Sequence, residues 1–307
     1  MTALVYKSTG SWYVIKTEDG VWANARIKGK LKIAGLTSSN PIAVGDRVVL
    51  EQEPGSDNYI ISGVEDRRNY INRQSPANKN QHHIIAANLD QTLLFATLKS
   101  PRTSTGFMDR FLVTAEAYHV PAIVVFNKLD LYEAHEHEVL AAMHDCYEGI
   151  GYQVMGISVA TGEGLDAVKA LLAGKTTLLS GHSGVGKSSF INALFPEMDL
   201  RTQEVSDWSG KGLHTTTFAE MFDLPGGGAI IDTPGIRELG LVDISRQDLS
   251  HYFPEMRDRL NDCQFNNCLH VNEPGCAIKA AVVDGDITED RYVSYVNLLE
   301  GIQENRW

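Results

Sequence analysis

The sequence lacks several features that would place the protein in a specialised class. Its 307 residues contain no uninterrupted run of the ~18 apolar residues that a membrane-spanning helix needs. The first residues lack the basic start, the apolar stretch and the small-residue cleavage site of a secretory signal. There is no internal repeat and no low-complexity tract. These absences predict a cytoplasmic protein without a membrane partner, in which the 43% of hydrophobic residues form ordinary buried cores.

Positive charge is scarce as well, and it is unevenly placed. The formal net charge is −12, which argues against nucleic-acid binding by the whole surface. Residues 1–80 hold 11 Lys/Arg and 8 Asp/Glu, whereas residues 245–307 hold 6 and 11. If nucleic acid is a partner, the N-terminal part is therefore the better candidate, although its small excess also fits a normal solvated surface. The acidic charge of the C-terminal region is as compatible with binding to a protein as with a local contact to RNA.

Cysteine is rare, and three of the four cysteines lie close together. Cys146 stands alone, whereas the others follow the pattern Cys263-x4-Cys268-x-His270-x5-Cys276. Three thiolates and one imidazole form the closed tetrahedral set of a structural zinc site, with no open position for catalysis. In a reducing compartment such a cluster favours metal over disulfides. We expect one structural Zn²⁺ on these four residues; the alternative is a group of unrelated buried thiols.

The first part of the chain predicts a small all-β domain. Short β-branched and aromatic runs at 12–16, 21–27, 46–51 and 58–64 are separated by turn sequences. Four or five such strands predict a barrel, with the OB-fold as first choice and another small β-domain as the alternative. Residues 67–82 are polar and predict a linker with a small basic group, Arg67, Arg68 and Arg73.

Strands and helices then alternate, which predicts a mostly parallel sheet with helices on both faces. Strands are expected at 92–97, 121–126, 152–158, 176–181, 217–222 and 228–232. Helices are expected at 107–119, 133–149, 163–173 and from Lys187 onward. From about residue 245 the strand signals stop, and helical patterns, such as that of 287–302, flank the cysteine cluster.

The strongest local motif follows the strand at 176–181 and opens the next helix. It fits the pattern G-x-x-x-x-G-K-[ST], in which backbone N–H groups curl around phosphate oxygens and the helix N-terminus favours the anion. We expect Lys187 to reach the phosphates and act in catalysis, and Ser188 to ligate Mg²⁺. The predicted phosphate-binding residues are Gly181, His182, Ser183, Gly184, Val185, Gly186, Lys187, Ser188 and Ser189.

A second motif predicts a guanine site. Asn127, Lys128, Leu129 and Asp130 form an N-K-x-D tetrad at the end of the strand 121–126. The Asp130 carboxylate can accept hydrogen bonds from the ring N–H and the exocyclic amine of guanine together, whereas adenine would leave buried groups unpaired. Ser158, Val159 and Ala160 follow another strand and could support the base through a backbone N–H.

Two further segments predict the γ-phosphate end of the site. Asp232-Thr233-Pro234-Gly235 follows the strand 228–232, so Asp232 could hold Mg²⁺ through water and the Gly235 N–H could sense the γ-phosphate. Residues 212–217, GLHTTT, are typical of a mobile switch loop that places a threonine, by preference Thr216, on Mg²⁺. The alternative is a polar loop that only enters the next strand.

The residue after this D-x-x-G segment is Ile236, where many GTPases carry a glutamine that orients the attacking water. Isoleucine cannot orient water, so intrinsic hydrolysis is expected to be slow. His214 is the candidate to orient the water instead; otherwise it is a loop histidine without a catalytic role.

The segments NKLD, SVA, GHSGVGKS, HTTT and DTPG resemble the five signatures of the GTPase superfamily in a rotated order. Rejoining a doubly wound sheet at a surface loop preserves its site, because the same strand ends still meet. With a barrel before this region and a Cys/His cluster after it, the whole chain resembles the RsgA (YjeQ) family of circularly permuted GTPases of small-ribosomal-subunit assembly. The resemblance implies a GTPase that uses Mg²⁺ and zinc, with GTP, GDP, the small subunit and its rRNA as partners.

We therefore predict an OB-fold-like barrel (1–73), a linker (74–90), a circularly permuted P-loop GTPase domain (91–244) and an α-helical zinc-binding domain (245–307), acting as a monomer. The resemblance implies a late assembly factor that the small subunit stimulates and that leaves after hydrolysis. Two alternatives are a GTP-dependent switch on another ribonucleoprotein or protein target and a zinc/OB adaptor with a vestigial site. Intact phosphate and base segments disfavour the adaptor.

Overall fold

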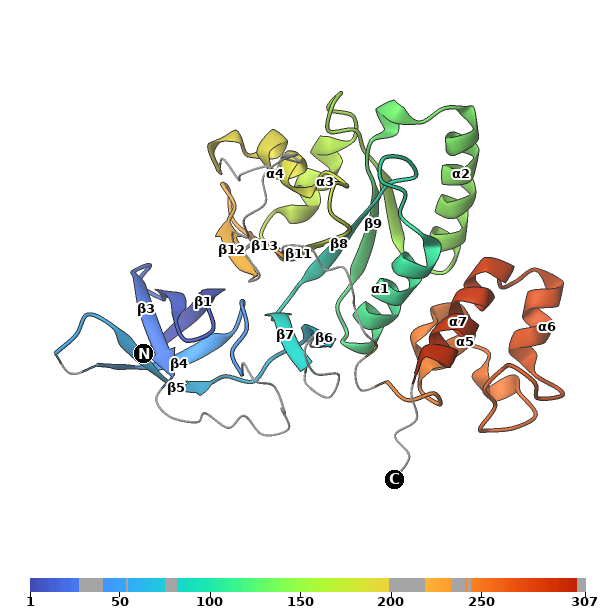
Figure 1. The fold of residues 1–307 in the computed structure, drawn as a ribbon, viewed down its shortest axis with the longest axis horizontal. Helices are drawn as coiled ribbons and strands as arrows, with labels where there is room; N and C mark the ends of the chain where they lie inside the picture. Colours follow the sequence, from blue (N-terminus) through green and yellow to red (C-terminus); the bar gives the residue numbers. More distant parts are fainter. Residues whose placement is uncertain are drawn as a thin grey trace, which may run out of the picture.

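The computed structural model describes residues 1–27, 41–53, 55–74, 82–198, 219–233, 241 and 244–302. Three bodies follow one another along the chain: a strand barrel, an α/β sheet covered by helices, and a group of helices (Figure 1). This architecture confirms the predicted fold class. Among the described residues, no helix is both long enough and apolar enough to span a bilayer.

The N-terminal body is a closed five-stranded barrel. Its strands pair in the order β1-β2-β3-β5-β4, and β4 returns to β1. They are β1 (Thr2–Ser8), β2 (Tyr13–Thr17), β3 (Trp22–Ile27), β4 (Arg47–Gln52) and β5 (Tyr59–Val64). Alternate residues point inward, so Val5, Tyr13, Ile15 and Ile61 fill the interior. This closed strand order is the OB-like barrel that the sequence predicted.

The predicted linker contains a two-stranded antiparallel sheet. Strands β6 (Tyr70–Gln74) and β7 (His82–Ala87) pair with each other, and β7 also meets the barrel through a bridge between Val44 and Ala86. The sequence did not predict these two strands, because polar residues surround the buried apolar ones, among them Ile71 and Ala86. The chain crosses from the barrel to the central sheet through this hairpin.

Two of the three arginines of the predicted basic group serve the structure itself. Arg67 is buried, and its guanidinium donates to both carboxylate oxygens of Asp46, at 2.7 and 2.6 Å, and to the carbonyl of Pro41 at 2.7 Å. Arg68 pairs with Asp90 at 2.7 Å. Arg67 therefore fixes the barrel end, a structural role that its membership of the predicted basic group did not indicate.

The central sheet has six strands in the order β10-β9-β8-β11-β13-β12, all parallel except β12. In chain order they are β8 (Gln91–Ala96), β9 (Ala122–Phe126), β10 (Gln153–Gly156), β11 (Thr176–Ser180), β12 (Glu220–Asp223) and β13 (Ala229–Asp232). The near-continuous apolar sequence of β8 and β9 reflects burial on both faces.

Helices cover both faces of this sheet, as expected for a doubly wound fold. One core packs α1 (Thr105–Ala117) and α2 (Ala134–Gly149) against residues such as Leu94 and Val124. The other packs α3 (Leu165–Leu172) and α4 (Lys187–Leu194) against Leu93 and Phe95. Short 3-10 turns, η1 (Leu129–Leu131) and η2 (Pro196–Met198), follow β9 and α4.

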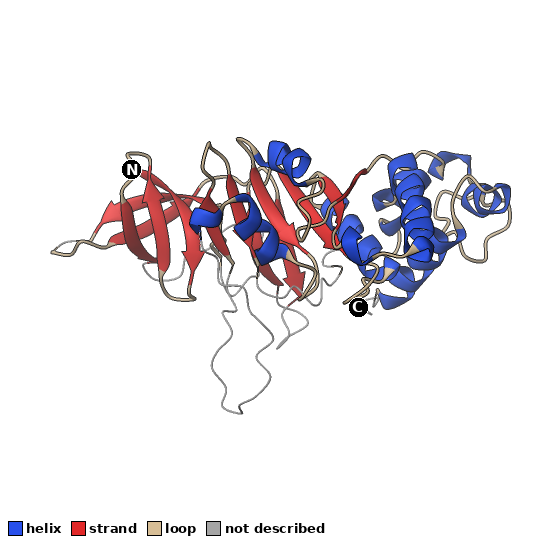
Figure 2. Ribbon diagram, turned by 90° about the horizontal axis from the view of Figure 1, so that it is seen from above, coloured by secondary structure: helices blue, strands red, loops and turns tan. Residues whose placement is uncertain are grey.

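The barrel and the central sheet join edge to edge. Strand β1 pairs with β12 through Lys7 and Glu220, whose side chains also form an ion pair at 2.7 Å. Figure 2 shows the strands of both bodies side by side in one extended array. The barrel thus contacts the strand that lies directly after the predicted switch segment.

The C-terminal body packs on helix α1. Its elements are η3 (Leu249–Tyr252), α5 (Pro254–Arg257), η4 (Leu260–Asp262), α6 (Ala277–Asp284) and α7 (Glu289–Gly301). Val113 of α1 belongs to their core. Arg291 of α7 donates to Asp109 of α1 at 2.6 Å and to Glu255 of α5 at 2.7 Å, and all three side chains are buried. A fully enclosed ion-pair network therefore holds this body to the central one.

Candidate functional site

The glycine-rich loop lies between β11 and α4, as the motif predicted. Gly181 and Gly186 have φ values of +134° and +98°, a region that side chains rarely adopt. A Cβ on Gly181 would collide with the Phe95 carbonyl, and one on Gly186 would collide with the Asn127 amide. Glycine is therefore required at both ends of the loop. The loop delivers backbone N–H groups to the N-terminus of α4, where an anion is favoured.

Lys187 lies inside the curl of this loop. Its ammonium donates to the carbonyls of Gly181 at 2.7 Å and His182 at 3.0 Å. Burial lowers the pKa of Lys187, while Asp232 opposes the change. Burial likewise raises the pKa of Asp232, while Lys187 opposes it. The two groups therefore share one enclosed region at the ends of β11 and β13, where an anion and a cation can both be held.

His182 packs against helix α1. Its ring stacks on Phe107 with centroids 3.8 Å apart and an angle of 30° between the planes. Burial and the neighbouring Lys187 lower the pKa of His182, which favours the neutral imidazole. The sequence offered no signal for this contact, because Phe107 lies 75 positions away.

Asn127 joins three of the predicted segments. Its Nδ2 donates to the Val185 carbonyl of the glycine-rich loop at 2.8 Å. Its Oδ1 accepts from the backbone N–H groups of Lys128 at 2.7 Å and Val159 at 3.3 Å. One buried side chain thereby fixes the phosphate loop, the N-K-x-D segment and the 158–160 segment relative to one another.

Asp130 is oriented by a residue whose side chain the sequence had not assigned a role. The Ser158 hydroxyl donates to Asp130 Oδ1 and accepts from the Thr161 N–H at 3.2 Å. Lys128 adopts a left-handed backbone with φ 67°, and its ammonium donates to the Ser100 carbonyl. These bonds fix the orientation of the Asp130 carboxylate and of the Lys128 ammonium.

The remaining predicted residues divide into two sets. Ser183 and Gly184 lie in the glycine-rich loop, Ser188 and Ser189 lie in the first turn of α4, and Ala160 follows Val159. The described part of the molecule therefore gathers the predicted base and phosphate segments from four strand ends, those of β9, β10, β11 and β13. His214, Thr216 and Gly235 lie outside the described residues.

Comparison with known proteins identifies this arrangement. A family profile described as RsgA GTPase matches residues 64–242, and one described as RsgA N-terminal domain matches residues 2–60. The chain belongs to the RsgA family. It is accordingly a GTPase, and its rotated motif order is that of a circularly permuted member of the fold.

Relatives within the RsgA family match over the whole length. A protein of Bacteroides fragilis, named small ribosomal subunit biogenesis GTPase RsgA, is 49% identical and covers 100% of this chain and 99% of its own. A protein of the same name from Christiangramia forsetii is 48% identical, with 99% and 98% covered.

Solved structures agree with this assignment. YjeQ from Thermotoga maritima superposes with a TM-score of 0.78 at 33% identity and covers 99% of both chains. YloQ, described as a circularly permuted GTPase, gives 0.72 at 29% identity and covers 100% of this chain and 96% of its own.

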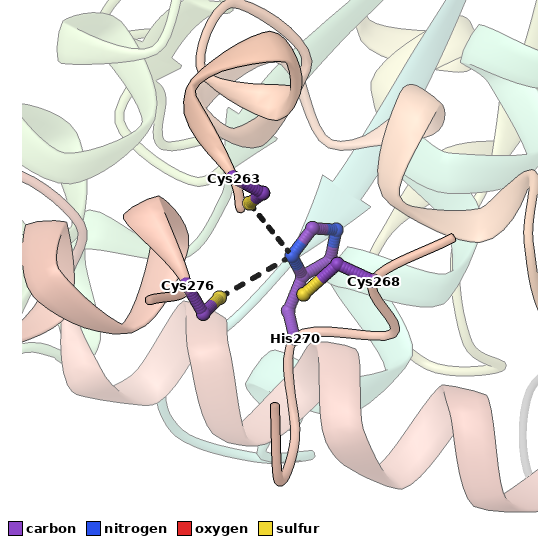
Figure 3. Close-up of side chains that lie close together, drawn as sticks. All are labelled: Cys263, Cys268, His270 and Cys276. Carbon is purple, nitrogen blue, oxygen red and sulfur yellow. Dashed lines mark hydrogen bonds between the residues drawn. The ribbon is translucent and has the colours of Figure 1, made fainter. Parts of the chain in front are cut away.

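The second site of this RsgA-family chain is the cysteine–histidine cluster. One ligand atom from each of Cys263, Cys268, His270 and Cys276 lies within 4.8 Å of all the others. The imidazole Nδ1 faces two of the thiols, Cys263 at 3.6 Å and Cys276 at 3.4 Å (Figure 3). This donor set fits one tetrahedral zinc ion. Burial, and after it the neighbouring thiols Cys276 and Cys263, raises the pKa of Cys268 to about 12. A bound cation would favour the thiolate and lower this pKa.

Neighbouring residues hold the ligand loop in place. Glu273 accepts from the backbone N–H groups of Leu269, Val271 and Asn272, each at 3.0 Å. The hydroxyls of Tyr292 and Tyr295 on α7 donate to the carbonyls of His270 and Leu269 at 2.7 and 2.9 Å. The loop that carries the cluster is therefore bonded to α7, an arrangement that fits a structural role.

Proposed function

We propose that this GTPase acts in the assembly and maturation of the small ribosomal subunit, and that the subunit stimulates its hydrolysis of GTP. The observation that best supports the GTP site is the set of hydrogen bonds made by Asn127, which join the predicted guanine segment to the phosphate loop and to the 158–160 segment. The full-length identity to two relatives named for small-subunit biogenesis supports the target. We further propose that the protein works as a cytoplasmic monomer and contacts rRNA.

Each segment has a distinct role in this proposal. Asp130 pairs with the guanine edge, and Ser158 holds its carboxylate ready. The loop 181–186 wraps the phosphates with backbone N–H groups, and Lys187 neutralises their charge. Ser188, Asp232 and Thr216 would hold Mg²⁺, and Gly235 would sense the γ-phosphate. Mg²⁺ supplies positive charge that offsets the charge of the transferring phosphoryl group.

Positioning and charge neutralisation carry the chemistry, and no covalent intermediate forms. Ile236 leaves no side chain after the D-x-x-G segment to orient water. We propose that subunit binding orders the loop 209–217, which brings Thr216 to the metal and His214 toward the γ-phosphate. Slow turnover alone and fast turnover on the subunit follow from this arrangement.

Steady-state GTP turnover with purified small subunits tests the proposal, with large subunits as the matched control. The expected result is a strong stimulation by small subunits only. Equal rates with either subunit, or no stimulation by either, would remove the small subunit as the target. Turnover that responds to another ribonucleoprotein instead would support the alternative of a switch on a different partner.

Substitution of His214 tests the proposed source of water orientation. His214→Ala should bind GTP and subunits normally and lose most stimulated turnover in single-turnover assays with saturating subunits. His135→Ala, an exposed histidine on α2, is the control and should behave as the wild type. If His214→Ala hydrolyses GTP at the wild-type rate, a backbone or ribosomal group orients the water.

A further inference from the structure

A segment outside every predicted motif runs along the proposed nucleotide site. It comprises residues 97–107, from the end of β8 to the first turn of α1, and we call it the β8–α1 segment. The Ser100 carbonyl accepts from the Lys128 ammonium of the N-K-x-D tetrad. Pro101 lies against the phosphate loop, since a Cβ on Gly184 would be 3.5 Å from the Cδ atom of Pro101. The segment therefore contacts both the predicted base-reading part and the predicted phosphate-binding part of the site.

Internal hydrogen bonds fix the backbone of the β8–α1 segment. Thr103 donates its backbone N–H to the Thr97 carbonyl at 2.7 Å, and its hydroxyl accepts from the Thr97 N–H at 3.1 Å. Both threonines are buried. Ser104 then caps α1, and its hydroxyl accepts from the Phe107 N–H at 3.3 Å. These bonds determine where Phe107 stands on the first turn of α1.

The Phe107 side chain joins the hydrophobic core to the phosphate loop. It is half-buried and packs against the core that α1 and α2 share with the central sheet. Its ring also faces the His182 imidazole, with centroids 3.8 Å apart and 30° between the planes, which is a stacked van der Waals contact. Because Phe107 is held by the core, the stack restricts the movement of the His182 ring and of the peptide that carries it.

The same part of the loop holds Lys187. The carbonyls of Gly181 and His182 accept from the Lys187 ammonium at 2.7 and 3.0 Å. Within the described ranges these are its two hydrogen-bond acceptors, so one of the three N–H donors of the ammonium remains for a phosphate oxygen. The two carbonyls set the direction of that third N–H. A displacement of the His182 peptide would therefore turn Lys187 away from the phosphates.

We propose that Phe107 is a positioning residue for GTP hydrolysis, which acts through the His182 ring on the direction of the Lys187 ammonium. The inference rests on the proposed role of Lys187 in neutralising the phosphate charge. This charge shifts as the phosphoryl group is transferred, so a misdirected ammonium slows hydrolysis more than it weakens GTP binding. A phenylalanine that only filled the core would contribute to stability and leave the rate of hydrolysis unchanged.

Single-turnover hydrolysis of GTP by the full-length protein without ribosomal subunits tests the inference, together with GTP affinity from calorimetric titration. Phe107→Leu keeps an apolar side chain on the core but removes the ring. It should lower the maximal rate about tenfold with little change in affinity. Phe107→Tyr keeps the ring and should retain most of the wild-type rate. Arg110→Ala, at an exposed position of the same helix, is the control and should behave as the wild type.

A double-mutant cycle with His182→Ala tests whether the two rings act as a unit. His182→Ala should slow hydrolysis to the same extent as Phe107→Leu, and the double variant should be no slower than either single variant. His182→Ala leaves the core intact, so it keeps the test valid if Phe107→Leu is unstable. Three results would overturn the inference: a wild-type rate in both single variants, effects that multiply in the double variant, and equal losses in Phe107→Tyr and Phe107→Leu.

Lys187→Met separates this inference from the role proposed for Lys187. If Lys187→Met loses hydrolysis while Phe107→Leu and His182→Ala keep the wild-type rate, the positioning role of Phe107 alone is wrong. If Lys187→Met hydrolyses GTP at the wild-type rate, the proposed role of Lys187 is wrong and the inference that rests on it is wrong too. Because the assay contains no subunits, neither result bears on the proposed ribosomal target.

Discussion

The proposed nucleotide site takes its described residues from positions 127 to 232, whereas the cysteine–histidine cluster takes all four of its candidate ligands from positions 263 to 276. The residues of the first site come together because the ends of β9, β10, β11 and β13 lie along one edge of a sheet, with β8 between β9 and β11. It depends on which strands are neighbours and not on their order in the chain, so circular permutation preserves it. The second site is local, and its four residues could hold one ion.

This contrast predicts that loss of the metal destabilises the protein more than any other change considered below. It also predicts that the destabilisation stays within the C-terminal body. Cys276→Ser should lose zinc and loosen residues 245–302, since structural zinc contributes on the order of 10 kcal/mol to small domains. GTP affinity should change little. Elemental analysis and hydrogen exchange of the same samples measure both effects, with Cys146→Ser as the control outside the cluster. Fully folded wild-type protein without zinc would contradict this prediction.

Breaking the ion-pair network at helix α1 tests whether this network holds the C-terminal body to the central body. Arg291→Met leaves Asp109 and Glu255 buried without their shared partner and should lower the free energy of unfolding by about 3–5 kcal/mol. Arg259→Met breaks an exposed pair with Asp286 and should cost less than about 1 kcal/mol. Urea unfolding compares the two variants. Equal losses would show that the buried network does not hold the bodies together.

Within the proposed nucleotide site, Asn127 should contribute more to GTP affinity than any single loop, because it bonds to three of the segments. Asn127→Ala removes the bond to the Val185 carbonyl and the acceptor for two backbone N–H groups. We expect a loss of about 1–3 kcal/mol in GTP affinity, together with a looser phosphate loop. Calorimetric titration with GTP and hydrogen exchange over residues 181–189 measure this. Unchanged exchange in that loop would mean that it is held without Asn127.

The smallest expected effect concerns the orientation of the base-reading carboxylate. Ser158→Ala removes one hydroxyl donor from Asp130, while Asn127 still holds the segment. A loss of about 1 kcal/mol, or roughly fivefold in GTP affinity, is expected. Ser189→Ala, on the first turn of α4, is a comparison in which the guanine side is untouched. If Ser189→Ala lost more GTP affinity than Ser158→Ala, the hydroxyl near the phosphates would contribute more to binding than the hydroxyl beside Asp130.

Much of this molecule could be predicted from its sequence because the informative patterns are local. The alternation of apolar strands and amphipathic helices gave the central sheet, and the motifs at its strand ends marked the site. The links between these ends were not predictable, since the bonds from Asn127 to Val185 and from Arg291 to Asp109 span 58 and 182 positions. No spacing rule reports such contacts.

Other misses have a physical reason as well. Arg67 was counted in the small basic group of a polar linker, yet its side chain forms a largely buried ion pair with Asp46. The strands β6 and β7 were missed because β6 is mostly polar and the apolar run of β7 is short.

Base selectivity tests the central claim most directly, namely that segments in rotated order rebuild one guanine site. We would measure the affinities of GTP and xanthosine triphosphate for the wild type and for Asp130→Asn. The wild type should prefer GTP by at least about a hundredfold, and the variant should shift its preference toward xanthosine triphosphate, because a carbonyl replaces the amine on that base. An unchanged ratio of the two affinities would place Asp130 outside the base site and contradict the account.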